Sequence, residues 1–74
     1  MTSYKNKAKS IIAKNLRKYR ELARITQINL SIKIQKSPEY ISRIERGVML
    51  PGVEVLYEIA DILDIDPCLL ILDK

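Results

Sequence analysis

The chain has 74 residues and a formal net charge of +4, and 47% of its residues are hydrophobic, enough for one small core. It contains no His and a single Cys, which excludes a disulfide within one chain, a Cys/His zinc site and the common acid–base and nucleophilic centres. We therefore expect no enzymatic activity, no metal, no cofactor and no small-molecule ligand.

Composition also bears on fold and location. Only two Gly and three Pro are present. These are too few turn residues for a typical all-β fold, so an all-α domain is favoured. No apolar run approaches the roughly 18 residues of a membrane span, and no apolar stretch follows the basic N-terminus as in a signal peptide. We expect a cytoplasmic protein with no membrane partner.

The charges are unevenly distributed. Residues 1–46 contain 12 Lys and Arg against 3 Asp and Glu, whereas residues 47–74 contain 1 Lys against 6 Asp and Glu. The basic half is a candidate for binding a polyanion such as nucleic acid. A solvated basic surface would give the same composition, so charge alone leaves both interpretations open.

The first predicted element is a helix over residues 10–23, with Ser10 as its N-cap. Its apolar positions recur at helical spacing and are Ile12, Leu16, Tyr19 and Ala23. Residues 1–9 carry three Lys and little apolar content. We interpret them as a basic N-terminal arm or as an extension of this helix, and residues 10–74 as the folded domain.

Residues 28–34 read INLSIKI and alternate apolar and polar side chains, the pattern of a half-buried strand. A strand needs a partner, and no second strand-like segment exists in the chain. Thr26 can cap a helix instead, and Leu30 and Ile34 lie four residues apart, so both can face a core. We therefore predict a second helix.

That helix leaves Ile28 and Ile32 on another face. They pack under the N-terminal arm, with Tyr4 as a candidate contact, or they form a second interface. The sequence does not decide between these two interpretations.

The next helix is predicted over residues 38–46. Ser37-Pro38-Glu39 combines a cap, a proline at the first helical position and an acid in the first turn. Ile41 and Ile44 then share one face, and Gly47 suits a left-handed stop position.

Residues 48–52 form a loop with a Pro-Gly pair. A fourth helix follows, whose apolar positions are Val53, Leu56, Ile59, Ala60 and Leu63. Asp64 is expected at its stop position. Asp66-Pro67 repeats the cap-plus-proline signal and begins a short fifth helix over residues 68–72.

Two short helices with a tight turn between them, over about residues 26–46, make a helix-turn-helix. The stretch from Ile12 to Leu72 resembles the Cro/C1-type (Xre) helix-turn-helix domains of bacterial and phage regulators, which have an all-α, lambda-repressor-like fold of five helices. The resemblance rests on the Thr26-Gln27 start and the string from Ile41 to Gly47. It rests further on Leu16, Arg20, Leu30, Ile34, Pro51, Leu56, Ala60, Leu63 and Asp66-Pro67.

The sequence departs from the family pattern at four places. Gln35 stands where the turn usually has Gly, which costs about 1 kcal/mol in a left-handed conformation. Lys36 replaces an apolar residue, and Ser31 replaces the small Ala of the second helix. Val48-Met49-Leu50 replaces basic or polar residues, which argues against phosphate contacts from that loop.

The resemblance implies that the third helix lies in the major groove and that its N-terminal residues meet base edges. Arg43 suits guanine, Glu39 can accept from cytosine, and Tyr40 can contact a thymine methyl or a phosphate. Each also has a structural alternative: a solvated arginine, a helix-dipole acid and a core tyrosine. The full set expected at DNA is Thr26, Gln27, Lys36, Ser37, Glu39, Tyr40, Ser42, Arg43 and Arg46, with the lysines of the first helix adding backbone contacts.

The resemblance also implies that Arg20 and Glu45 form a structural salt bridge, so Arg20 is not counted as a DNA contact. Surplus apolar residues predict a homodimer, because exposed apolar patches mark interfaces. They are Val48, Met49, Leu50, Val55, Cys68 and Leu69. If these residues only cover a small core, no dimer is required.

The expected function is sequence-specific transcription regulation by a dimer on a two-fold operator. The Tyr40–Arg46 string also resembles that of controller proteins of restriction–modification systems, which contact RNA polymerase. A phage Cro-like repressor fits equally. The alternative from another class is a protein-interaction module, of antitoxin or anti-repressor type, with little DNA readout.

Overall fold

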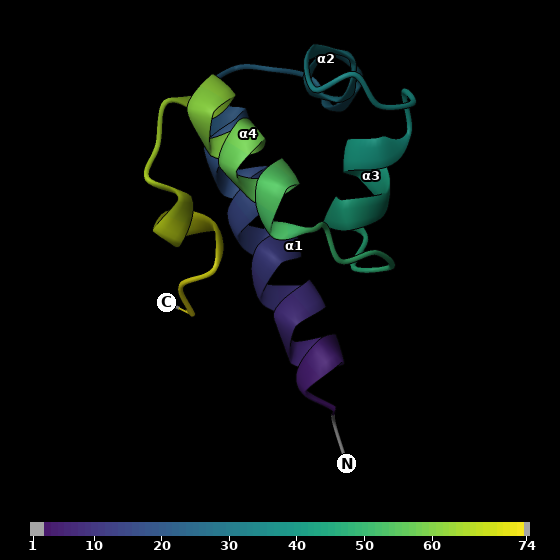
Figure 1. Cartoon of the computed structure of the whole chain (residues 1–74), viewed down its shortest axis with the longest axis vertical. Helices are drawn as coiled ribbons and strands as arrows, with labels where there is room; N and C mark the ends of the chain where they lie inside the picture. The colour runs from purple at the N-terminus through teal and green to yellow at the C-terminus, as the bar shows by residue number, and fades with distance from the viewer. Residues whose placement is uncertain (1–2, 74) are drawn as a thin grey trace.

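In the computed structural model, which describes residues 3–73, the chain folds into α1 (Tyr4–Leu22), α2 (Gln27–Lys33), α3 (Tyr40–Glu45) and α4 (Val53–Leu63), followed by the 3₁₀ helix η1 (Pro67–Leu70). The predicted all-α fold is confirmed. The fifth helix of the expected five is a single 3₁₀ turn. Figure 1 shows α1 as the long axis of the molecule, with α2 and α3 on one side and the C-terminal segment on the other.

The start of α1 differs from the prediction of a helix beginning at Ser10. Ser3 is the N-cap, and its hydroxyl accepts from the backbone N–H of Asn6 at 3.3 Å. No Gly or Pro interrupts residues 4–9, and Lys and Ala favour helix. Residues 4–9 are therefore an extension of the first helix, while the rest of the predicted arm, residues 1–2, lies outside the described residues.

The INLSIKI stretch is helical, as predicted from Thr26. The Thr26 hydroxyl accepts from the backbone N–H of Asn29 at 3.1 Å and caps α2. Ile28 and Ile32 are 55% and 57% exposed. The alternative that they pack under the N-terminal segment with Tyr4 is wrong, because α2 lies at the opposite end of α1 from the N-terminus (Figure 1).

The turn between α2 and α3 is held by backbone and side-chain bonds. Gln35 adopts the predicted left-handed conformation, with φ of 59°. The buried Ser31 hydroxyl donates to the Gln27 carbonyl at 2.9 Å and accepts from the Ile41 N–H at 3.1 Å. Ser31 therefore joins the two helices with a bond that the usual Ala could not make.

The ends of the later helices follow the sequence signals closely. Pro38 and Glu39 form a turn, so α3 begins two residues later than predicted. Gly47 and Asp64 have φ of 74° and 57°, the left-handed stop conformations expected of them. The Asp66 carboxylate accepts from the Cys68 N–H at 2.9 Å and caps η1.

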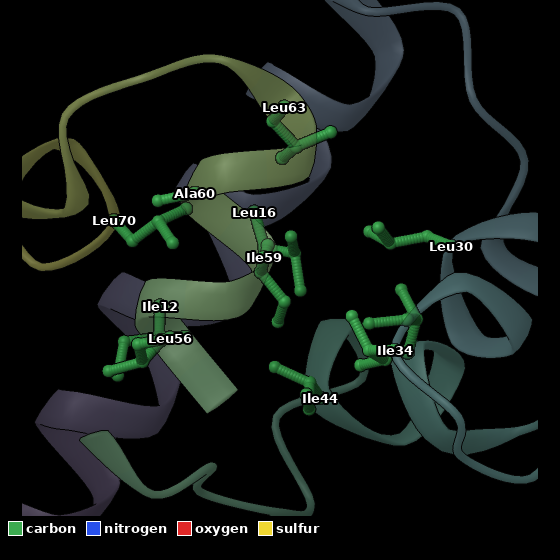
Figure 2. Close-up of a cluster of buried hydrophobic side chains, with 11 residues drawn as sticks. Ile12, Leu16, Leu30, Ile34, Ile44, Leu56, Ile59, Ala60, Leu63 and Leu70 are labelled. Atoms are coloured by element: carbon green, nitrogen blue, oxygen red, sulfur yellow. The ribbon is translucent and has the colours of Figure 1, made fainter. Parts of the chain in front are cut away.

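One core joins all these elements. Leu16, Leu30, Ile41, Ile44 and Ile59 are almost completely buried, together with Ile12, Ile34, Leu56, Ala60, Leu63 and Leu70. Figure 2 shows side chains from α1 and α4 meeting those of α2 and α3 in this cluster.

Two positions assigned to the core by periodicity are exposed. Val53 is 70% exposed and Ala23 lies at the C-terminal cap of α1. Each lies at the end of its helix, where the chain turns away from the core and periodicity no longer reports burial.

A buried asparagine ties the C-terminal segment to α1. The side-chain amide of Asn15 donates to the carbonyls of Leu70 at 3.2 Å and Leu72 at 2.7 Å. Because the η1 segment follows the last long helix, these bonds fix its position against α1.

We expect Asn15→Ala to lower the free energy of unfolding by about 1–3 kcal/mol, because a buried carbonyl loses its donor. Asn29→Ala removes the same group from an exposed position and should change it by less than about 0.5 kcal/mol. Urea denaturation of both variants measures the difference. Equal effects would show that the Asn15 bonds contribute nothing specific.

Candidate nucleic-acid interface

The centre of the candidate interface is the carboxylate of Glu45 at the end of α3. Arg20 donates to it twice, from Nε to Oε2 at 2.6 Å and from Nη2 to Oε1 at 3.1 Å. The two side chains are 11% and 0% exposed. Hydrogen bonding to Glu45 raises the pKa of Arg20 and outweighs burial, which lowers it.

Three further hydrogen bonds extend this pair. Gln27 Nε2 donates to Glu45 Oε1 at 2.9 Å, and Arg17 Nε lies 3.4 Å from the same oxygen. Arg20 Nη1 also donates to the Ile25 carbonyl at 2.8 Å. One buried carboxylate thus fixes α3 relative to α1, to the segment between α1 and α2, and to the first residue of α2.

This network changes the part that Gln27 can play. Its side-chain NH₂ group donates inward to Glu45, whereas the resemblance placed Gln27 among the residues expected at DNA. A contact with phosphate would have to use its backbone N–H or its second amide hydrogen.

The outward face of α3 carries polar and charged side chains. Glu39, Arg43 and Arg46 are exposed, and their spacing of four and three residues places them on one side of the helix. Ser42 is partly buried, and its carbonyl accepts from Arg46 Nε at 3.4 Å.

The turn before α3 adds a second group of exposed side chains. Lys36 and Ser37 are exposed, and Lys36 Nζ lies 5.3 Å from the centre of the Tyr40 ring. Thr26, at the start of α2, is exposed as well, with its hydroxyl used for capping. In Figure 1, α2, the turn after it and α3 lie together on the side of α1 away from the C-terminal segment.

Tyr40 combines the two roles that the sequence left open. Its ring packs against the core, while part of the side chain is exposed. Burial, and then the negative charge of Glu58, raise the pKa of its phenol. The group stays protonated at neutral pH and can donate a hydrogen bond.

The acidic residues of the second half of the chain lie elsewhere. Glu54, Glu58 and Asp61 are exposed on α4, and Asp64 and Asp66 follow it. Glu39 and Glu45 are the two carboxylates of α3 and its flanking turn, and Glu45 is neutralised by Arg20. The face of α3 is consequently basic.

Other kinds of site find no support in the described part of the chain. Residues 3–73 contain no group of His, Cys, Asp or Glu side chains that could hold a metal ion. Within the same residues, no helix is long and apolar enough to cross a membrane. Cys68 is exposed, and a hydrogen bond to Asp66 raises the pKa of its thiol, which reduces the fraction of reactive thiolate.

Comparison with known proteins agrees with this geometry. A model of the helix-turn-helix family matches residues 16–70. No curated protein matches the sequence.

Two solved structures resemble the chain. A crystal structure of a hypothetical transcription factor, NHTF from Neisseria, has a TM-score of 0.82 at 22% identity, over 88% of this chain and 75% of that one. A solution structure of the SOS-response transcriptional repressor LexA from Eubacterium rectale has a TM-score of 0.84 at 29% identity, over 92% and 72%. The first likeness concerns the fold alone.

We expect Glu45→Ala to lower the free energy of unfolding by about 3–5 kcal/mol, because it leaves the Arg20 charge buried and uncompensated. Glu21 is the matched control, since it lies 3.9 Å from the same arginine with its side chain 64% exposed. Glu21→Ala should cost less than about 1 kcal/mol.

Thermal and urea unfolding of the two variants, with Arg20→Met/Glu45→Leu as a third, measure these costs. The double variant should be more stable than Glu45→Ala, since it removes both charges. If Glu45→Ala and Glu21→Ala cost the same, Glu45 is not the centre of the interface.

Proposed function

The chain belongs to the Cro/C1-type helix-turn-helix family and is a DNA-binding transcriptional regulator, and we propose that it recognises a specific operator by placing α3 in the major groove. The main support for this proposal is that the charged side chains around α3 fall into two groups, one bonded inside the molecule and the other exposed. Glu45 and Arg20 satisfy each other inside the molecule, while Arg43 is exposed on the outward face. A free guanidinium on a helix whose position is fixed is suited to reading a base edge.

The outward side chains divide into base-reading and backbone-contacting groups. Arg43 pairs with guanine O6 and N7, and Glu39 accepts from cytosine N4. Tyr40 contacts a thymine methyl or a phosphate. The remaining contacts, which position the protein on the backbone, come from Thr26, Gln27, Lys36, Ser37, Ser42 and Arg46.

We propose further that the chain binds as a homodimer. A single α3 of six residues reads few base pairs, and two-fold dimers of this kind read half-sites about one helical turn apart. Of the six residues predicted at the interface, Val48, Leu50 and Cys68 are exposed, while Met49, Val55 and Leu69 are partly buried.

Two exposed side chains on α4 extend this surface. Val53 and Tyr57 are 70% and 62% exposed, next to the loop that carries Val48 and Leu50. Exposed apolar residues gathered on one loop and the helix after it are typical of an interface. Their charged neighbours, Glu54 and Asp61, would form its polar rim.

Two regulatory roles are compatible with this DNA contact: a restriction–modification controller and a phage Cro-like repressor. In a restriction–modification controller the dimer would also contact RNA polymerase, whereas a phage Cro-like repressor would only block it. An endonuclease and methyltransferase beside the gene favour the first role, and phage genes favour the second.

Arg43→Ala should weaken binding to the operator by about 1–3 kcal/mol, because a bidentate base contact is lost. Binding to arbitrary DNA should change little. Among the lysines of the first helix, Lys18 lies beside Leu69 and Leu72 of the C-terminal segment, so we exclude it from the backbone contacts expected of that helix and use Lys18→Ala as the matched control.

The measurement is fluorescence anisotropy with DNA from directly upstream of the chain's own gene, after footprinting has located the site. If Arg43→Ala and Lys18→Ala bind that site as tightly as the wild type, base readout by α3 is wrong. The exposed apolar residues of the acidic half, such as Val53 and Tyr57, would then favour a protein-interaction module.

Val53→Glu should shift the chain from dimer to monomer, because a carboxylate would be buried without a partner. Ile28→Glu changes another exposed apolar residue, on α2 and outside the proposed interface, and should leave the oligomeric state unchanged. Sedimentation equilibrium over a concentration series distinguishes them. A wild type that remains monomeric up to about 100 µM would contradict the dimer.

A further inference from the structure

A groove runs between the N-terminal half of α1 and the end of α3. Its lining includes Asn6, Ser10, Lys14, Arg17, Arg46 and Gly47, and its volume is about 630 Å³. We call it the α1–α3 groove. Asn6 belongs to the helical extension that the sequence left open as an arm.

The groove is strongly basic. Lys14, Arg17 and Arg46 supply three positive charges, and the Arg17 side chain is 54% exposed. Glu45 is the one carboxylate among its lining residues, and its side chain is fully buried and accepts from Arg20 and, at 3.4 Å, from Arg17 Nε. Asn6 and Ser10 add neutral donors, so the chemistry of the groove suits a phosphate.

The groove is continuous with the face of α3 that is proposed to read DNA. Arg46 lies three residues after Arg43 on the same side of the helix and also lines the groove. An α3 of six residues is about 9 Å long, and the major groove is about 12 Å wide. When the start of α3 points toward the bases, its end is close enough to the sugar-phosphate wall for a long side chain such as that of Arg46 to reach a phosphate.

We propose that the α1–α3 groove binds phosphates of the DNA strand that flanks the major groove occupied by α3. This inference rests on the proposed function and adds a second backbone contact made by α1. The loop after α3, residues 48–52, carries no charged side chain. The basic groove supplies the backbone contact that this loop lacks.

Ser10 is the position from which the proposal is best tested. It is exposed and lines the groove, so its substitution should leave the fold intact. A separate hollow on its other side contains Lys7 and Asp73. Ser10→Glu places a carboxylate at the groove, and Ser10→Gln is its uncharged counterpart of the same size.

Lys18→Gln completes the set of variants. It changes the net charge by the same amount as Ser10→Glu but lies beside Leu69 and Leu72, outside the groove. Thermal unfolding of all three variants checks that they are folded.

Affinity for a short duplex of arbitrary sequence is measured by anisotropy at salt concentrations from about 50 to 200 mM. Relative to Ser10→Gln, Ser10→Glu should bind more weakly and flatten the slope of log K against log salt by about 0.9, the loss of one phosphate contact. Lys18→Gln should change the slope by less than half as much.

The proposal would be overturned if Ser10→Glu and Ser10→Gln had the same slope of log K against log salt. It would also be overturned if Lys18→Gln changed that slope as much as Ser10→Glu does. Inorganic phosphate at constant ionic strength is a second probe. Binding of phosphate that Ser10→Glu abolishes, with no change in the duplex slope, would indicate a site for free anions and would also overturn it.

The same experiments separate this inference from the proposed function. If the wild type prefers operator DNA and Arg43→Ala loses that preference, but Ser10→Glu and Ser10→Gln have the same salt slope, only the proposed phosphate contact in the groove is wrong. A wild type that binds operator and arbitrary DNA equally would contradict the proposed function, and the groove with it.

Discussion

The structure depends on one buried carboxylate. Helices of seven and six residues, the lengths of α2 and α3, are too short to be stable in isolation, since isolated helices need about 12–15 residues even in favourable sequences. Their geometry must therefore come from contacts with the rest of the molecule. The shared core supplies apolar contacts, and Glu45 adds directional ones by accepting from Arg20 on α1 and Gln27 on α2. Because an unpaired charge is costly when it is buried, the loss of either Arg20 or Glu45 should destabilise the whole arrangement.

Around this carboxylate, the basic and most of the acidic side chains lie on different elements. The ion pair leaves no uncompensated acid at the end of α3, where basic side chains of α3 and α1 lie near one another. The acidic side chains of α4 accompany exposed apolar ones, Val53 and Tyr57. This separation would let the proposed DNA contact and the proposed dimer contact coexist on a chain of 74 residues.

Much of the fold could be predicted because local and tertiary signals agreed. Thr26, Gly47, Asp64 and Asp66-Pro67 mark helix ends through side-chain or backbone chemistry that acts over a few residues. The alternating INLSIKI stretch has the pattern of a strand, but the sequence offers no partner strand, and this already favoured a helix. Its small Ser31 is explained by a hydrogen bond to α3, which depends on tertiary structure.

The features that escaped prediction are those set by distant neighbours. Asn15 looks like an ordinary polar residue in a helix, and its role appears only when the C-terminal segment folds back onto α1. Arg24 has φ of 59° without being Gly or Asn, so composition gave no sign of it. Ser3 and Ser10 are equally good caps by sequence, and only continuous helix-forming residues between them favour Ser3. In the candidate interface, the inward orientation of the Gln27 amide could not be predicted without knowing where Glu45 lies.

The most direct test of the account is chemical-shift mapping of the ¹⁵N-labelled chain on its footprinted operator. The largest changes are expected on residues 35–46, on the start of α2 and on the groove-lining residues of α1, with the outer face of α4 unaffected by DNA beyond the effects of dimerisation. Changes concentrated on α4 and the C-terminal segment, with α3 unperturbed, would contradict it.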